Sequence, residues 1–405
     1  MYNLAKSEAS VRGTRRIYLD YAASTPISPA ARKAMRLAAR FSGNPSSLHE
    51  EGRRAREVYE DARSRVARIV GAQPQEIIFT GSGSEADALA VIGVARAHRR
   101  IGTHLIVSSI EHKAILKSAE ALAGEGFSIS YLPVSREGLA SPEDLAKLLR
   151  EDTILVSVMY ANNEIGTVES IQKLAEVVQA HRSGTAAPFF HTDACQAPGQ
   201  LPISVADLGV DLMSINSSKV YGPKGIGALY IRQGIPLVPL IGGEQERSLR
   251  GGTESAELAA GFAAALEEAD GRREEETLRL RGLRDLFFSE IERSIPDAVI
   301  NGHRTQRLPN NIHVSLPGIE GESILLLLDA AGIACATGSA CNSFDLAPSH
   351  VLLALGNDAP LAHGSIRFSL GRETTEEDVR QVVYELSRIV ERLRGISALT
   401  THLAV

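Results

Sequence analysis

The stretch SINSSKVYGPKG, residues 214–225, decides which fold we expect. An apolar run at 211–215 passes into small polar residues, and Lys219 and a Gly/Pro turn follow at once. This pattern predicts a strand that ends shortly before Lys219, and open α/β sheets bind their ligands at the carboxyl ends of strands. A lysine at such a position could form a Schiff base with a carbonyl cofactor. The alternative is an ordinary surface lysine in a turn.

Outward from this stretch, short apolar strands alternate with amphipathic helices over the first two-thirds of the chain. Val- and Ile-rich strands in such an alternation are typical of βαβ units in a mostly parallel sheet, so we expect an α/β fold. The expected strands are 76–80, 104–108, 129–133, 153–159, 189–193, 211–215 and 225–231, and the expected helices are 84–99, 113–125, 142–150 and 170–181.

Near Ser255 the pattern changes. A long helical stretch runs to about residue 294, and a strand, an apolar helix, a second strand and a final helix follow at 311–315, 323–331, 365–369 and 375–394. The final helix begins after two threonines with an acidic first turn, which favours a capped N-terminus. We therefore expect two domains, a large one at 28–265 and a smaller α/β domain made of 1–27 together with 266–405.

Composition excludes several classes of protein. The 405 residues carry a formal charge of −6, so no overall basic field indicates nucleic acid or an anionic membrane as partner, and we interpret the basic clusters 12–16 and 53–56 as exposed, solvated charge. Three cysteines in a chain of this length argue against a disulfide framework and for a reducing compartment. Without an 18-residue apolar run or the apolar core of a signal peptide, the expected location is the cytoplasm. Residues 1–16 are interpreted as a partly ordered arm.

Two further segments suit a phosphorylated cofactor. The apolar run FFHTD ends in Asp193, and a carboxylate there needs a cation or several donors, for which a protonated pyridine nitrogen would serve. The alternative is a capping aspartate. The segment TGSGSEA, residues 80–86, passes from a strand through a Gly/Ser loop into a helix, where free N–H groups and the helix dipole suit a phosphate. It lacks the GK[ST] ending of a Walker motif, and many strand-to-helix turns look alike.

Three side chains complete the candidate site. His112 follows the strand at 104–108 and could stack on a cofactor ring or move protons, although a helix N-terminal or surface histidine fits the same pattern. Arg367 lies inside an apolar strand and needs an anion, either a substrate carboxylate or an internal salt bridge. Cys341 lies in a Gly/Ser/Asn segment, which we expect to be a mobile loop with a reactive thiol. Cys335 follows an apolar run, and we expect it to be buried. No metal site is predicted, because CxxC spacing is absent.

Taken together, these segments resemble the cysteine desulfurases of the IscS/NifS type, which are fold-type I, class-V aminotransferase-like enzymes that use pyridoxal 5′-phosphate (PLP). The resemblance covers nearly the whole chain. The stretches that carry it are YLDYAA (18–23), GNPSS (43–47), NNEIG (162–166), YGPKGIGALY (221–230), RGGT (250–253) and GSAC (338–341).

This resemblance implies a role for each candidate residue. Lys219 would carry the cofactor, Asp193 would pair with its ring nitrogen, and Gln196 would bond its phenolic oxygen. His112 would stack on the ring and assist proton transfer. The phosphate would be held by Ser82 and Gly83, by Asn216 and Ser218 in the loop before the lysine, and by Thr253 across a homodimer interface.

For the substrate, L-cysteine, the resemblance implies that Asn163 and Arg367 grip the carboxylate and that Cys341 accepts the sulfur. The catalytic set would be Cys341, Lys219 and His112. The products would be alanine and a persulfide on Cys341. The persulfide would pass to an acceptor protein for iron–sulfur cluster assembly, tRNA thiolation or DNA phosphorothioation.

The chain departs from the family pattern before the lysine, where Asn216-Ser217-Ser218 replaces the usual Ser-Gly-His. The Ser218 hydroxyl or the Asn216 amide could take the place of the histidine. A selenocysteine lyase or another PLP β-lyase is the alternative enzyme. A non-catalytic partner or regulator that kept the fold is the alternative from another class, and the joint presence of all these residues argues against it.

Overall fold

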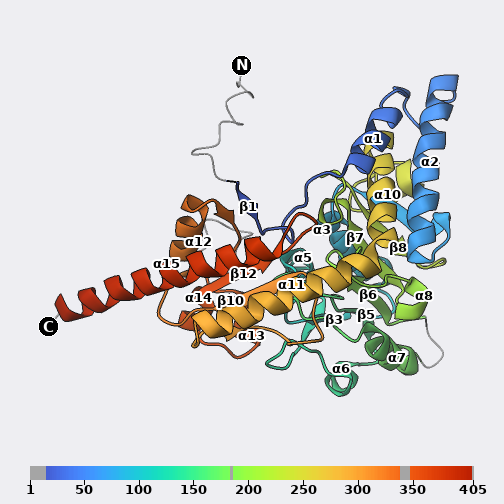
Figure 1. Ribbon diagram of the computed structural model, residues 1–405. Coiled ribbons are helices and arrows are strands. Elements are labelled where there is room, and N and C mark those ends of the chain that lie inside the picture. The colour runs from blue at the N-terminus through green and yellow to red at the C-terminus, as the bar shows by residue number, and fades with distance from the viewer. Residues whose placement is uncertain (1–14, 183–185, 338–346, 404–405) are drawn as a thin grey trace.

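The computed structural model describes residues 15–182, 186–337 and 347–403, the last seven without their side chains. Its centre is a seven-stranded sheet in the order β2-β8-β7-β6-β5-β3-β4 (Figure 1). Only β8 runs antiparallel to its neighbours, so the other six strands end at the same edge. The strands are β2 (Ile77–Thr80), β3 (His104–Ser108), β4 (Ser128–Leu132), β5 (Thr153–Ser157), β6 (Phe189–Asp193), β7 (Leu212–Asn216) and β8 (Gly227–Ile231).

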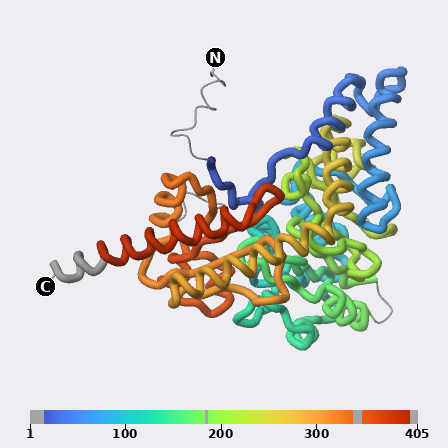
Figure 2. Tube along the Cα trace, in the orientation of Figure 1, coloured from blue at the N-terminus to red at the C-terminus, as the bar shows by residue number. Residues whose placement is uncertain are grey.

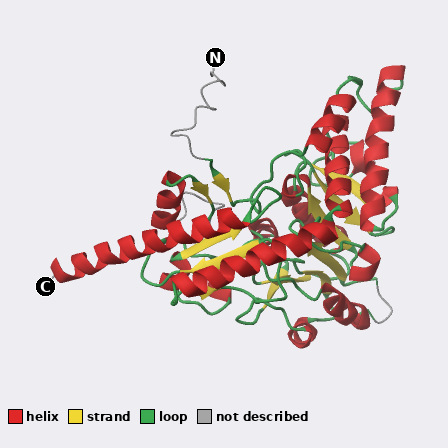
Figure 3. Ribbon diagram, in the orientation of Figure 1, coloured by secondary structure: helices red, strands yellow, loops and turns green. Residues whose placement is uncertain are grey.

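Helices cover both faces of this sheet (Figure 3). Alternate strand residues enter two separate apolar clusters, one on each face, as the two-residue period of a strand requires. One face is covered by α1 (Pro29–Ala38), α2 (Glu50–Val70), α6 (Pro142–Leu148), α7 (Ile171–His181), α8 (Val205–Leu208) and α10 (Ala256–Gly271). The other is covered by α3 (Gly83–Ala88), α4 (Val94–His98) and α5 (Lys113–Gly124).

A third apolar cluster is built around a second, smaller sheet. Strands β9 (Val299–Ile300), β10 (Asn311–Ser315) and β12 (Ser365–Ser369) pair antiparallel, and the short β1 (Ile17–Tyr18) pairs parallel with β11 (Ile333–Ala334). The helices of this cluster are α11 (Arg273–Ser294), α12 (Gly321–Ala330) and α15 (Glu376–Leu403). The short helices α13 (His350–Ala354) and α14 (Ala359–His363) pack in a fourth, small cluster with residues that follow β3 and β5. The chain trace shows the first described residues, which include β1, beside this C-terminal part (Figure 2).

The division into domains stays a prediction. Ile17 and Leu19 pack into the third cluster, in line with the assignment of 1–27 to the smaller domain. The boundary expected between 265 and 266 falls inside α10, whose Leu266 and Ala269 still pack against the large sheet.

The mostly parallel α/β sheet is confirmed, and each predicted strand is present within a few residues of its expected bounds. The helical stretch at 255–294 is two helices, α10 and α11, and the final helix continues to Leu403. Helices α1 and α2 were not predicted. On α2 the core positions Ala55, Tyr59, Ala62, Val66 and Val70 have helical spacing, but they are scattered among many charged residues.

The arginines of the 53–56 cluster are exposed on α2, as expected. Most of the N-terminal arm and the segment with Cys341 lie outside the described residues. Within the described ranges, no helix has the length and apolar run needed to cross a membrane.

Candidate active site

One cavity of about 180 Å³ lies at the edge where six strands of the large sheet end. The connections after β3, β5, β6 and β7 each contribute to its wall, because parallel strands bring their carboxyl ends together. Eight of the predicted site residues line it: Gly83, His112, Asn163, Asp193, Gln196, Asn216, Lys219 and Arg367.

Lys219 follows β7 in a tight turn that is stabilised by Asn216. The Asn216 Oδ1 accepts hydrogen bonds from the Ser218 N (2.9 Å) and the Ser218 Oγ (3.1 Å). The Lys219 Nζ donates to the Ala23 carbonyl at 2.6 Å. Of the two residues considered as substitutes for the missing histidine, Asn216 lines the cavity, and Ser218 is not among the lining residues.

Asp193 ends β6 and is buried, with Oδ1 accepting from the Cys195 N at 2.8 Å. It therefore makes the local bond of a capping aspartate and also faces the cavity. Gln196, three residues later, donates from Nε2 to the Ala22 carbonyl at 3.1 Å.

The predicted phosphate loop lies against Asn216 and Cys195. Ser82 caps α3, because its hydroxyl accepts from the Glu85 N at 3.1 Å, and it is not among the residues that line the cavity. A β-carbon on Gly83 would lie 2.6 Å from the Cys195 Sγ, so the close approach of these segments requires glycine there.

The guanidinium of Arg367 is buried at the cavity wall between two parts of the chain. Nη1 donates to the Asn163 carbonyl (2.9 Å) and Nη2 to the Asp20 Oδ1 (2.8 Å). The internal salt bridge considered as an alternative is therefore present. Nε is buried and has no hydrogen-bond partner among the described residues, so the guanidinium keeps a donor for a further anion.

His112 combines the two positions considered for it. It is the N-cap of α5, where its Nδ1 accepts from the Ala114 N at 3.2 Å, and its side chain lines the cavity.

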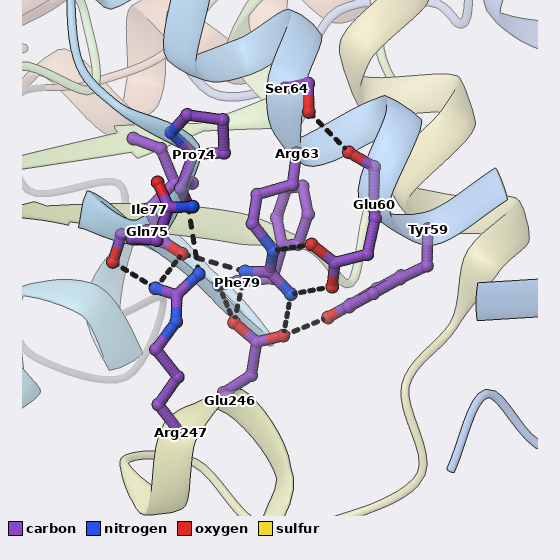
Figure 4. A network of polar contacts seen from close by, with 10 residues as sticks. All are labelled: Tyr59, Glu60, Arg63, Ser64, Pro74, Gln75, Ile77, Phe79, Glu246 and Arg247. Atoms are coloured by element: carbon purple, nitrogen blue, oxygen red, sulfur yellow. Dashed lines mark hydrogen bonds and ion pairs between the residues drawn. The ribbon is translucent and has the colours of Figure 1, made fainter. Parts of the chain in front are cut away.

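Thr253 is exposed and is not among the cavity-lining residues. The segment before it is anchored by a buried ion pair, shown in Figure 4, in which Glu246 accepts from Arg63 at 2.6 and 2.8 Å. Tyr59 OH and the Phe79 N also donate to Glu246, each at 2.6 Å. Arg250 joins this segment to the phosphate loop through Glu85, with the Arg250 Nε 2.8 Å from the Glu85 Oε1.

Several cavity residues were missed by sequence reasoning: Asp20, Ala22, Ala23, Ser84, Asp87, Met159 and Cys195. For Asp87 a signal existed, because positions 83 and 87 are one helical turn apart and face the same way. Asp20 gave no local signal, since its partner Arg367 lies 347 residues away.

The structure describes two of the three cysteines, Cys195 and Cys335. Burial raises the pKa of Cys195 and raises the pKa of Cys335 to about 12, so both thiols are poor nucleophiles at neutral pH. Cys341 lies outside the described residues.

These side chains fit PLP. An amine, a buried carboxylate, an imidazole and the first turn of a helix face one cavity. Two buried polar atoms of its lining residues, the Oδ1 of Asp87 and the Nε of Arg367, have no hydrogen-bond partner among the described residues. Such atoms are expected where a polar ligand binds. No group of three or more potential metal ligands occurs among the described residues.

Comparison with known proteins gives consistent results. The family model for class-V aminotransferases matches residues 17–382. The cysteine desulfurase IscS of Dictyoglomus turgidum is 50% identical over 386 residues, which cover 95% of this chain and 96% of that protein. A solved NifS-like protein superposes with a TM-score of 0.87 at 36% identity, covering 94% of this chain and 100% of its own. The structure of SspA in complex with cysteine has a TM-score of 0.76 at 35% identity, covering 87% and 98% of the two chains.

Proposed function

Because this chain belongs to the cysteine desulfurases of the class-V aminotransferase family, we propose that it binds PLP on Lys219 and moves the sulfur of L-cysteine to Cys341. The family depends on PLP. The observation that carries the proposal is the single cavity at the sheet edge, in which the side chains of Lys219, Asp193, His112 and Arg367 meet.

PLP, when bound, supplies an electron-accepting ring that makes the loss of a Cα proton and the cleavage of a Cβ–S bond feasible. Asp193 would hold a positive ring nitrogen, Gln196 would bond the phenolic oxygen and His112 would stack on the ring. Gly83 and Asn216 would lie toward the phosphate, and Ser82 and Ser218 would support them through the loop hydrogen bonds described above.

On the substrate side, the buried Nε of Arg367 would take the carboxylate, together with Asn163. The Lys219 amine would remove the Cα proton. The Cys341 thiolate would then attack the substrate sulfur, so that an S–S bond forms as the Cβ–S bond breaks. The electron pair of the broken bond stays on the substrate carbon, which takes up a proton and becomes alanine, and Cys341 becomes a persulfide.

Replacement of Lys219 tests the cofactor assignment. Lys219→Ala should lose the yellow absorbance of the bound cofactor and all alanine production. The control is Lys224→Ala in the same segment, an exposed lysine that should leave both unchanged. Alanine production at the normal rate by Lys219→Ala would overturn the proposal.

Replacement of the cysteines tests the sulfur acceptor. Cys341→Ala should keep its colour and still change its spectrum when L-cysteine is added, because binding and Cα deprotonation do not need this thiol. Alanine release should fall by orders of magnitude. Cys335→Ala should form persulfide normally and lose about 1 kcal/mol of stability from the small cavity. If the two variants behaved the other way round, Cys341 would not be the acceptor.

The proposal also includes a homodimer and an acceptor protein that receives the sulfur. An exposed Thr253 fits a homodimer in which this residue reaches the partner's phosphate site, and an active monomer in sedimentation would contradict it. We place the enzyme in the cytoplasm, where thiols stay reduced. Capture of partners on Cys341→Ser would show whether the sulfur goes to cluster assembly, tRNA thiolation or DNA phosphorothioation.

A further inference from the structure

Asp87 is a buried acid in the cavity wall with no role in the chemistry above. It lies on α3 one helical turn after Gly83, is 1% exposed and lines the cavity. Its Oδ1 has no hydrogen-bond partner among the described residues, and the His191 Nε2 lies 3.9 Å from it. A buried carboxyl oxygen without a partner is unfavourable unless a ligand satisfies it.

Among the described residues, this carboxyl has no ion-pair partner other than His191. His191 bonds the Ser157 Oγ (2.9 Å) and the Ser214 Oγ (3.0 Å), and burial lowers the pKa of His191 to about 4, so its ring is neutral at neutral pH. Burial, and then repulsion from Asp193, raise the pKa of Asp87, while a hydrogen bond with the Ser214 side chain opposes this rise.

The charges of Asp87 and Asp193 also shift the pKa values of two neighbouring groups, Glu111 and Cys195. Glu111 is buried, and the negative charges of Asp193 and Asp87 add to the burial that raises its pKa. Burial and the negative charges of Asp193 and Asp87 also raise the pKa of Cys195, and the positive charge of Lys219 opposes this rise. Of the three carboxyl groups that line the cavity, that of Asp20 is paired with Arg367, and those of Asp87 and Asp193 are not paired with this guanidinium.

Two carboxyl groups in one desolvated wall cannot both ionise cheaply unless a cation lies beside them. We propose that Asp87 is a second acid beside the cofactor's ring nitrogen, an inference that rests on the proposed function. Asp87 and Asp193 would together balance the positive charge of the ring. Asp87 would thus be a binding residue for the charge of the ring, and the hydrogen bond of Asp193 would position the nitrogen.

The experiment compares two ligands on the apoprotein of the full chain. One is PLP, and the other is the PLP analogue whose ring nitrogen is replaced by C–H. Asp87→Asn should weaken PLP binding about tenfold at pH 8, the effect of one pKa unit of lost charge interaction. The same variant should bind the analogue as tightly as wild type does, because the analogue carries no ring charge.

The stability of the apoprotein gives a readout that does not depend on the cofactor. An acid with a raised folded-state pKa makes the protein less stable as the pH rises above the unfolded-state value, so Asp87→Asn apoprotein should melt higher than wild type. The gain should be larger at pH 8 than at pH 5. Glu169→Gln is the control, since Glu169 is a buried acid outside the cavity whose pKa is also raised, and PLP binding should not change.

The outcomes separate the two proposals. If wild-type apoprotein binds neither ligand, the proposed function fails. If PLP binds but Asp87→Asn weakens both ligands equally, or weakens neither, only the assignment of Asp87 fails. Asp87→Ser gives the same comparison if the asparagine variant does not fold.

Discussion

Two of the regions where this chain buries charged groups, the Arg63–Glu246 cluster and the wall of the cavity, differ in how these groups are paired. In the cluster, all three guanidinium nitrogens of Arg63 donate, to Glu60, Glu246 and the Ile77 carbonyl, and both carboxylate oxygens of Glu246 accept (Figure 4). In the cavity wall, the Oδ1 of Asp87 and the Nε of Arg367 have no hydrogen-bond partner among the described residues.

The full pairing in the Arg63–Glu246 cluster is typical of an ion pair that stabilises the fold, whereas unpartnered polar atoms in a cavity are typical of a binding site. A buried ion pair with every donor and acceptor used holds segments together, and here it holds α2 to three consecutive residues with positive φ, Glu246 to Ser248. Such backbone is unfavourable and persists only where contacts enforce it. The unpartnered Asp87 Oδ1 and Arg367 Nε contribute no such stability, and a polar ligand in the cavity would satisfy them.

The largest effect on stability is expected where the paired region is broken. Arg63→Ala leaves Glu246 buried without its cation, which should lower the free energy of unfolding by about 3–5 kcal/mol. Denaturant unfolding of the apoprotein measures it. Arg65→Ala on the same helix removes partly exposed pairs with Asp61 and Glu267 and should cost about 1 kcal/mol or less. If Arg63→Ala and Arg65→Ala lost the same free energy of unfolding, the buried Arg63–Glu246 pair would contribute no more than the partly exposed pairs of Arg65.

A change at Arg367 should weaken the binding of the substrate. Arg367→Lys keeps a positive charge but loses the planar fork, so the KM for L-cysteine should rise roughly 10- to 100-fold. The matched control is Arg372→Lys, because Arg372 pairs with Glu268 at 2.9 Å and stacks on Tyr221, outside the cavity. An unchanged KM in Arg367→Lys would place the substrate carboxylate elsewhere.

An acid that lies in neither region should affect how stability depends on pH. Burial raises the pKa of Glu169 to about 8, and the hydrogen bond from the Ala140 N opposes this rise. The folded state therefore keeps a proton that the unfolded chain loses, so stability falls as the pH rises from about 4.5 toward 8. Glu169→Gln should reduce this fall by a few kcal/mol at most, measured as melting temperature against pH. A wild-type profile that rises over this range would contradict the expected sign.

Local patterns in the sequence were sufficient for the strands and for most residues of the site. Strands β3, β6, β10 and β12 begin and end where alternation and turn residues placed them. Lys219 and Asp193 come directly after apolar strands, and strands of a parallel sheet end together, so their meeting at one edge could be predicted. Helix α2 was missed because its core residues are diluted by charge, although their spacing is helical.

What the sequence alone determined is therefore the alternation of strands and helices, the lysine at the end of a strand, and the family resemblance that named the reaction. Only the tertiary structure decided how the buried charges are balanced. Arg63 and Glu246 are 183 residues apart, and Asp20 and Arg367 are 347 apart. Whether Asp87 is buried without a partner depends on which side chains pack around it. The physical reason is that strand period and turn chemistry act over a few residues, whereas desolvation and ion pairing depend on which remote segments the fold brings together.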